Sequence, residues 1–124
     1  MKYLIDTCAW IEWLTNAPLS HQFEYYFRYL EKVLVPTLVQ FELYRWVERE
    51  KSEEMALEII GLTEQAKVIP LTTRIALHAA ELSKHHGLAM ADAIIYATAR
   101  DSEALLVTSD KHFKSLAQVK FFSK

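Results

Sequence analysis

Four carboxylate residues stand where an α/β chain could gather them: Asp6, Glu42, Asp92 and Asp110. Asp6 ends the apolar run of residues 3–5, and Asp110 follows a second such run that begins at residue 105. The carboxyl ends of parallel strands form one edge of a sheet, and ligands bind in the crevice there. Glu42 and Asp92 lie near the starts of helical segments and can face the same edge. The spacing therefore predicts four acids in one cleft.

Four carboxylates in one cleft repel each other strongly. At about 4 Å and an effective dielectric constant near 20, each pair costs roughly 4 kcal/mol. Such a cluster is tolerable only if it holds divalent cations or stays partly protonated. Because a site built from carboxylates alone suits hard ions that prefer oxygen ligands, the expected cofactor is Mg²⁺ or Mn²⁺.

Each acid also has an ordinary structural explanation. Asp6 and Asp110 are well placed to cap the helices that follow them. Glu42 resembles an exposed helix acid within one turn of Arg45. Asp92 is suited to the first turn of a helix, where a negative charge is favourable. It lies among small and apolar residues, however, and a charge in such surroundings is seldom buried without a partner or a metal ion.

The elements that must position these acids alternate along the chain. We expect strands at residues 2–6, 33–35, 67–69, 104–108 and 119–122. Between them we expect helices near residues 8–15, 20–32, 52–64, 73–87, 90–100 and 110–116, and one that opens at 36–37 with a capping box of Thr37 and Gln40. This alternation indicates the α/β class, with a parallel sheet flanked by helices on both faces. The length of 124 residues suits a single domain over residues 1–124.

Composition narrows the function classes. The formal net charge of −2 argues against a high-affinity nucleic-acid scaffold, but less against a nuclease whose metal ions supply local positive charge. The two glycines exclude the glycine-rich loops that cradle phosphates. The single cysteine, Cys8, excludes an internal disulfide and is expected to be a buried, inert thiol.

The hydropathy pattern predicts no membrane association. No apolar run approaches the roughly 20 residues needed to cross a bilayer. Asp6 also interrupts the first apolar run before a signal-peptide core could form. We therefore expect a cytoplasmic protein.

Four motifs, taken in order, are more specific than any acid alone. They are YLIDT at residues 3–7, PTLVQFEL at 36–43, GLAMADAIIYATA at 87–99 and LVTSDKHF at 106–113. In order and spacing this set resembles the PIN-domain family, and within it the toxin ribonucleases of VapBC-type toxin–antitoxin pairs. The motifs run from one end of the chain to the other, so the resemblance covers essentially the whole sequence.

The resemblance implies metal-dependent cleavage of RNA phosphodiesters. Under it, the four acids map onto the family's acidic metal-site positions, and Thr7 and Thr108 match supporting hydroxyl positions. We interpret Asp6 and Asp92 as direct ligands, and Glu42 and Asp110 as residues that bind through water or orient the nucleophile. The resemblance also implies an RNA substrate, a cognate antitoxin and a homodimer.

Three alternatives have to be weighed against this interpretation. A haloacid-dehalogenase-like phosphatase needs a second Asp two residues after the first, and position 8 is Cys. A response-regulator receiver needs an acidic pair near Asp6 and a phosphorylatable Asp after its third strand, and both are missing. A catalytically silent PIN-like module that binds protein or RNA stays open, although the complete acidic set argues against it.

Other polar and aromatic residues have simpler explanations. Three histidines near one helix end are expected to be solvated or hydrogen-bonded rather than a metal pair: His78, His85 and His86. Four other residues could contact phosphate or the RNA backbone, although a solvated surface position is the default: His112, Arg45, Arg49 and Lys111. Three tryptophans could stack bases, but packing in the core or at a partner interface is the default for them: Trp10, Trp13 and Trp46.

Overall fold

The computed structural model describes all residues, 1–124, and its centre is a parallel sheet of five strands. The strand order is β3-β2-β1-β4-β5, so the first strand lies in the middle. Its neighbours pair in register, with Tyr3 opposite Val33 on one side and Leu105 on the other. The strands are β1 (Tyr3–Ile5), β2 (Val33–Pro36), β3 (Lys67–Ile69), β4 (Leu105–Thr108) and β5 (Val119–Phe121).

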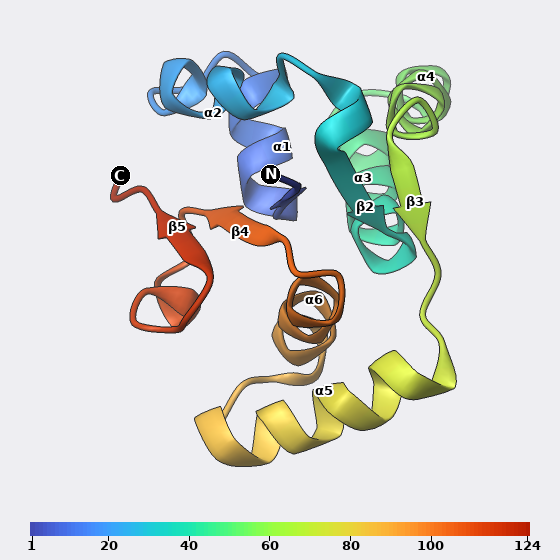
Figure 1. The fold of residues 1–124 in the computed structure, drawn as a ribbon. Coiled ribbons are helices and arrows are strands. Elements are labelled where there is room, and N and C mark those ends of the chain that lie inside the picture. Colours follow the sequence, from blue (N-terminus) through green and yellow to red (C-terminus); the bar gives the residue numbers. More distant parts are fainter.

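Helices cover both faces of this sheet, as the sequence predicts. In Figure 1, α1 and α2 lie toward the top of the view, whereas α5 and α6 lie toward the bottom. From β1 the chain adds β2 and then β3 on one side of the first strand, and it then crosses back to add β4 on the other side. Because such crossovers are right-handed, the helices before β3 and the helices after β3 lie on opposite faces of the sheet. The helices are α1 (Thr7–Leu14), α2 (Ser20–Phe27), α3 (Thr37–Glu50), α4 (Glu53–Thr63), α5 (Thr73–His86) and α6 (Met90–Asp101), with short 3₁₀ turns η1 (Leu30–Lys32) and η2 (Lys111–Phe113).

The central strands are apolar because helices bury them on both faces. Leu4 and Ile5 of β1 and Leu106 and Val107 of β4 are fully buried. Full burial of each such side chain contributes roughly 1.5–3 kcal/mol. The two strands that lead to Asp6 and Asp110 are therefore firmly anchored in the sheet. No helix in the structure is long and apolar enough to cross a membrane.

Several local predictions are corrected by the structure. The helix expected at 20–32 ends at Phe27 and resumes only as η1, and the one expected at 110–116 is only the 3₁₀ turn η2. The capping box at Thr37 is wrong, since no side chain caps α3. Gln40 instead donates to Thr63 Oγ1 at 3.0 Å and to Glu64 at 2.7 Å, which ties α3 to α4.

The turn before α6 is tightly specified. Gly87 ends α5 with a left-handed backbone, φ 68°, a conformation that glycine adopts without steric cost. Ser83 then donates its hydroxyl to the carbonyl of Leu88 at 2.6 Å. These two features fix where α6 begins, and so where its first-turn acid, Asp92, is placed.

Candidate active site

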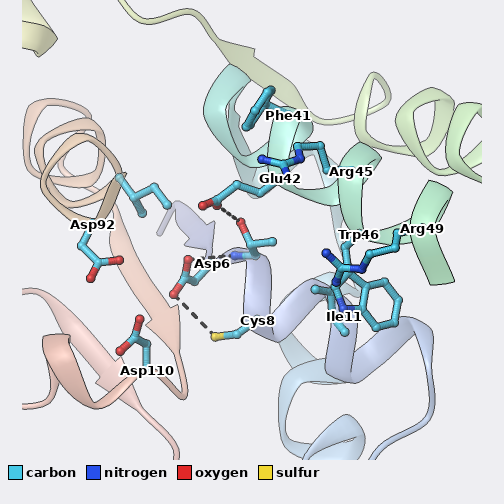
Figure 2. Close-up of a pocket in the computed structure, with 12 residues that line it drawn as sticks. Asp6, Cys8, Ile11, Phe41, Glu42, Arg45, Trp46, Arg49, Asp92 and Asp110 are labelled. Carbon is cyan, nitrogen blue, oxygen red and sulfur yellow. Dashed lines mark hydrogen bonds between the residues drawn. The ribbon is translucent and has the colours of Figure 1, made fainter. Parts of the chain in front are cut away.

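All four acids line one cavity of about 460 Å³ at the carboxyl edge of the sheet. Figure 2 shows Asp92 and Asp110 on one side of this cavity and Asp6 and Glu42 near its centre. They come from four different elements, because Asp6 and Asp110 follow β1 and β4 while Glu42 and Asp92 lie on α3 and α6. The four acids predicted from the sequence to share one cleft thus lie together in the structure. Their chemical roles stay a prediction.

Asp6 is the most constrained of the four. It is 5% exposed and caps α1, with its Oδ1 accepting the Thr7 N–H at 2.8 Å. Its Oδ2 accepts the Thr108 hydroxyl at 2.7 Å. Burial raises the pKa of Asp6 to about 6, against these hydrogen bonds, and the charge of Glu42 adds to the rise. Asp6 is therefore a helix cap, as the ordinary explanation proposes. Capping alone does not explain why a carboxylate is buried beside a second acid, where its ionised form is disfavoured.

Glu42 is held by the neighbour of Asp6. The Thr7 hydroxyl donates to Glu42 Oε1 at 2.6 Å, which links α1 to α3 (Figure 2). Burial raises the pKa of Glu42, the Thr7 hydrogen bond opposes this rise, and the charge of Asp92 adds to it. Both hydroxyls singled out in the sequence, those of Thr7 and Thr108, thus orient site carboxylates.

Asp92 and Asp110 face each other across an imidazole. His112 Nδ1 lies 3.0 Å from Asp92 Oδ2 and 3.1 Å from Asp110 Oδ1. Asp110 also caps η2 by accepting the His112 backbone N–H at 2.9 Å, while its own N–H donates to Thr108 Oγ1. The pKa of Asp92 is raised by burial and by the charge of Asp110, and His112 lowers it. The side chain of His112 is 71% exposed, in agreement with the surface position expected from the sequence, but its contact with both acids was not predicted.

The negative charge of the cavity has no cationic partner from lysine or arginine. None of the four acids forms an ion pair with such a residue, and His112 is the one basic side chain within 4.0 Å of any of them. Three of the four have raised pKa values that include a contribution from another site acid. A set of oxygen donors with unbalanced charge fits a hard divalent ion, Mg²⁺ or Mn²⁺. Asp92, Asp110 and His112 already offer ligand atoms within 4.8 Å of one another.

The opposite wall of the cavity is formed by α3. Phe41, Arg45, Trp46 and Arg49 line it together with Ile11 of α1 (Figure 2). Trp46 was expected in the core or at a partner interface, but it is a half-buried residue of this wall. Phe41 was not singled out in the sequence, because an aromatic residue at this helical spacing looks like a core residue.

Cys8 corrects another expectation. It was predicted to be buried among apolar residues, but it lines the cavity, with Sγ 3.5 Å from both Asp6 Oδ2 and Thr108 Oγ1. Burial and the charge of Asp6 raise the pKa of the thiol, so it stays protonated near neutral pH. The expected lack of reactivity therefore has a physical basis, although the surroundings are polar.

Comparison with known families agrees with this architecture. The model of the PIN domain family matches residues 3–119. The chain belongs to the PIN domain family. The resemblance seen in the four sequence motifs is thereby confirmed at the level of the family. No curated protein matches the sequence.

Solved structures share this PIN fold at low sequence identity. A toxin–antitoxin complex from Klebsiella pneumoniae has a TM-score of 0.84 at 19% identity, covering 99% of this chain and 100% of that one. DNA-bound VapBC from Salmonella typhimurium has a TM-score of 0.80 at 18% identity, covering 99% and 98%. VapC20 from Mycobacterium tuberculosis, described as a sarcin-ricin loop cleaving toxin, has a TM-score of 0.75 at 17% identity, covering 94% and 95%. These likenesses establish the fold.

Proposed function

We propose that this PIN-domain chain is a metal-dependent endoribonuclease, the toxin component of a VapBC-type toxin–antitoxin pair in the cytoplasm. The observation that carries the proposal is the convergence of Asp6, Glu42, Asp92 and Asp110 in one cavity without a lysine or arginine partner. A purely structural acid cluster would be destabilising, because its charges repel each other at neutral pH. The alternative is a silent PIN-like binding module, which would have no need of this charge.

The proposed reaction is hydrolysis of an RNA phosphodiester. A water oxygen forms a bond to phosphorus, and the phosphorus–oxygen ester bond to the leaving nucleotide breaks. One proton of the water ends on the leaving oxygen, and the other stays on the new hydroxyl group of the phosphate. A bound Mg²⁺ or Mn²⁺ supplies Lewis-acid stabilisation of the charge on the phosphate and an acidified water.

The chain's own residues supply position. Asp6 and Asp92 are proposed as direct metal ligands, and Glu42 and Asp110 as residues that bind through water or orient the attacking water. Thr7 and Thr108 hold Glu42 and Asp6 by hydrogen bonds of 2.6 and 2.7 Å, which limits the rotamers of both carboxylates. Such preorganisation lowers the barrier, because the groups need not reorder during the reaction.

An RNase assay on total RNA tests this function. The wild-type protein should cut RNA in Mg²⁺ or Mn²⁺ and stop in EDTA, and Asp92→Asn should show no detectable cleavage while keeping its circular dichroism spectrum. Asp101→Asn is the matched control on the same helix, since this acid pairs with Arg74 outside the cavity. Equal turnover by Asp92→Asn and Asp101→Asn would reject the metal-ligand role. A wild-type protein inactive with both metals would favour the silent module.

Two protein partners are also proposed. The antitoxin follows from the resemblance to VapBC toxins and is supported by the toxin–antitoxin complexes among the structural neighbours. A homodimer is supported by the exposed rings of Tyr25 and Tyr29 at the end of α2, which form more apolar surface than a buried helix face needs.

Light scattering at micromolar concentration tests the homodimer. We expect a mass twice the 14.4 kDa of one chain, and a shift toward the monomer in Tyr25→Glu. Glu58→Gln on the exposed side of α4 is a control that should keep the wild-type mass. A wild-type mass of 14.4 kDa throughout this range would contradict the dimer, and the nuclease proposal would be unaffected.

A further inference from the structure

One face of α3 carries a row of aromatic and cationic side chains along the acid cavity. Phe41, Arg45 and Arg49 recur every four residues, so they stack along one side of the helix at about 6 Å per step. All three line the cavity, and Phe41 is 55% exposed there. An exposed phenyl ring at the mouth of a polar cavity offers a flat apolar face to whatever enters that cavity.

Arg45 is a cation without an acidic partner. Its guanidinium lies 5.6 Å from the centroid of the Phe41 ring, and it forms no ion pair with any carboxylate. Its neighbour Glu42 is already engaged by the Thr7 hydroxyl. Arg49, by contrast, pairs with Glu50 at 3.0 Å. Of the two arginines that line the cavity, Arg45 is thus the one without an acidic partner.

An aromatic face beside a free guanidinium matches the chemistry of an unpaired nucleic-acid strand. Proteins bind single strands by stacking bases on exposed rings and by contacting the backbone phosphates with basic side chains. A duplex hides its base faces inside the stack, and only a splayed base could reach Phe41. An anion held by Arg45 would lie on the far side of the cavity from Asp92 and Asp110 (Figure 2).

We propose that Phe41 and Arg45 form a subsite for an unpaired RNA strand, in which the ring stacks a base and the guanidinium binds the phosphate of a nucleotide flanking the cut. This proposal rests on the proposed nuclease function and deepens it, because it names the two side chains of α3 that would hold the substrate strand beside the acids. The unpaired guanidinium beside an exposed ring favours RNA over an antitoxin peptide as occupant, because each nucleotide brings both a phosphate for Arg45 and a flat base for Phe41.

Binding to labelled RNA tests the subsite. The probe is a fluorescein-labelled RNA of mixed sequence, about 12 nucleotides long, alone or annealed to its complement. Measurements use the non-cleaving Asp92→Asn protein with Mg²⁺ present. Phe41→Ala should weaken binding of the single strand about fivefold to 100-fold, the loss expected for one stacked base. Phe41→Tyr should restore it, and Leu57→Ala, which truncates an equally exposed side chain on α4, should not change it.

The salt dependence of binding isolates the role of Arg45. Each phosphate neutralised on a single strand contributes about 0.7 to the slope of log K against log salt concentration. Arg45→Ala should lower the slope by about this amount, whereas Arg74→Ala, whose guanidinium pairs with Asp101 on another face, should leave it unchanged. A purely structural role of Arg45 would not alter the slope.

Three results would overturn the subsite: equal affinity for single strand and duplex, Phe41→Ala within twofold of its parent, or an unchanged salt slope in Arg45→Ala. A wall that serves a protein partner instead would give the second and third of these. The proposed function fails separately, if wild-type protein cleaves no RNA. A protein that cleaves RNA but meets one of the three conditions keeps its function and loses this subsite.

Discussion

The two walls of the cavity are built in opposite ways. The acid wall is assembled from strand ends and helix starts, with carboxylates held by hydroxyls and backbone N–H groups and with Asp6 only 5% exposed. The α3 wall consists of residues of that helix other than Glu42, with Phe41 55% exposed and Arg45 over its ring without an ion pair. Chemistry needs groups fixed in place, whereas a strand of varied sequence needs a surface that tolerates different bases.

This contrast also appears in the electrostatics. On the acid wall, burial and mutual repulsion raise the pKa values of Asp6, Glu42 and Asp92, so the wall stores unfavourable energy until a cation arrives. The other α3 residues at the cavity include no acid, so they add nothing to this repulsion: Phe41, Arg45, Trp46 and Arg49. Substitutions on the two walls should therefore differ in kind: on the acid wall they remove activity and change stability, and on the α3 wall they change affinity.

The largest effect is expected from Asp6→Asn. This variant should lose detectable cleavage, yet in EDTA it should be more stable than the wild type by about 3 kcal/mol at pH 8, the cost of raising the Asp6 pKa from 3.8 to about 6. Urea unfolding measures this difference, with Asp101→Asn as a control. A less stable Asp6→Asn at pH 8 would mean that its hydrogen bonds outweigh its burial.

The way stability changes with pH provides a second test of the raised Asp6 pKa. A carboxyl with a raised folded-state pKa keeps the folded protein protonated where the unfolded chain has ionised. The contribution of Asp6 to the free energy of unfolding is therefore most favourable below pH 4, and it is lost as the pH rises toward about 6 and above. In EDTA, the free energy of unfolding should fall across this pH range more for the wild type than for Asp6→Asn. Parallel curves of stability against pH would mean that the pKa of Asp6 is not raised in the folded protein.

A smaller effect is expected from metal binding. An ion that binds the assembled acids but not the unfolded chain stabilises the fold by about 2.7 kcal/mol at 100 times its Kd. Mn²⁺ should raise the melting temperature of the wild type by several degrees and leave that of Asp6→Asn unchanged. Titration calorimetry accompanies the melt, and no binding by either method, with or without RNA, would reject the metal site.

The smallest effect sharpens the role of the supporting hydroxyls. Thr7→Val keeps the side-chain shape but loses the 2.6 Å hydrogen bond to Glu42. Since a hydrogen bond to a charged group contributes roughly 1.5–3 kcal/mol, kcat should fall about tenfold to 100-fold with little change in KM. Thr15→Val, at the exposed end of α1, is the control. A rise in KM alone would assign Thr7 to substrate binding.

The acid wall was predictable from sequence because its logic is topological. Asp6 and Asp110 follow apolar runs, and neighbouring parallel strands necessarily end at the same edge. The contacts of His112 were not predictable, because they depend on the 3₁₀ turn that replaces the expected helix at 110–116. Nor was the exposure of Phe41, since the direction of each α3 side chain is set by packing against α4, which also draws Gln40 away from its expected cap.

The hydrogen bonds of Thr108 determine when the acid cavity can assemble during translation. Its hydroxyl joins Asp6, 102 residues earlier in the chain, to the backbone of Asp110. Closing so long a loop is entropically unfavourable until the intervening sheet has formed. β1 also lacks one of its two neighbours until the ribosome has added residues 105–108. A nascent chain therefore carries no assembled acid cavity until β4 and Asp110 have been translated.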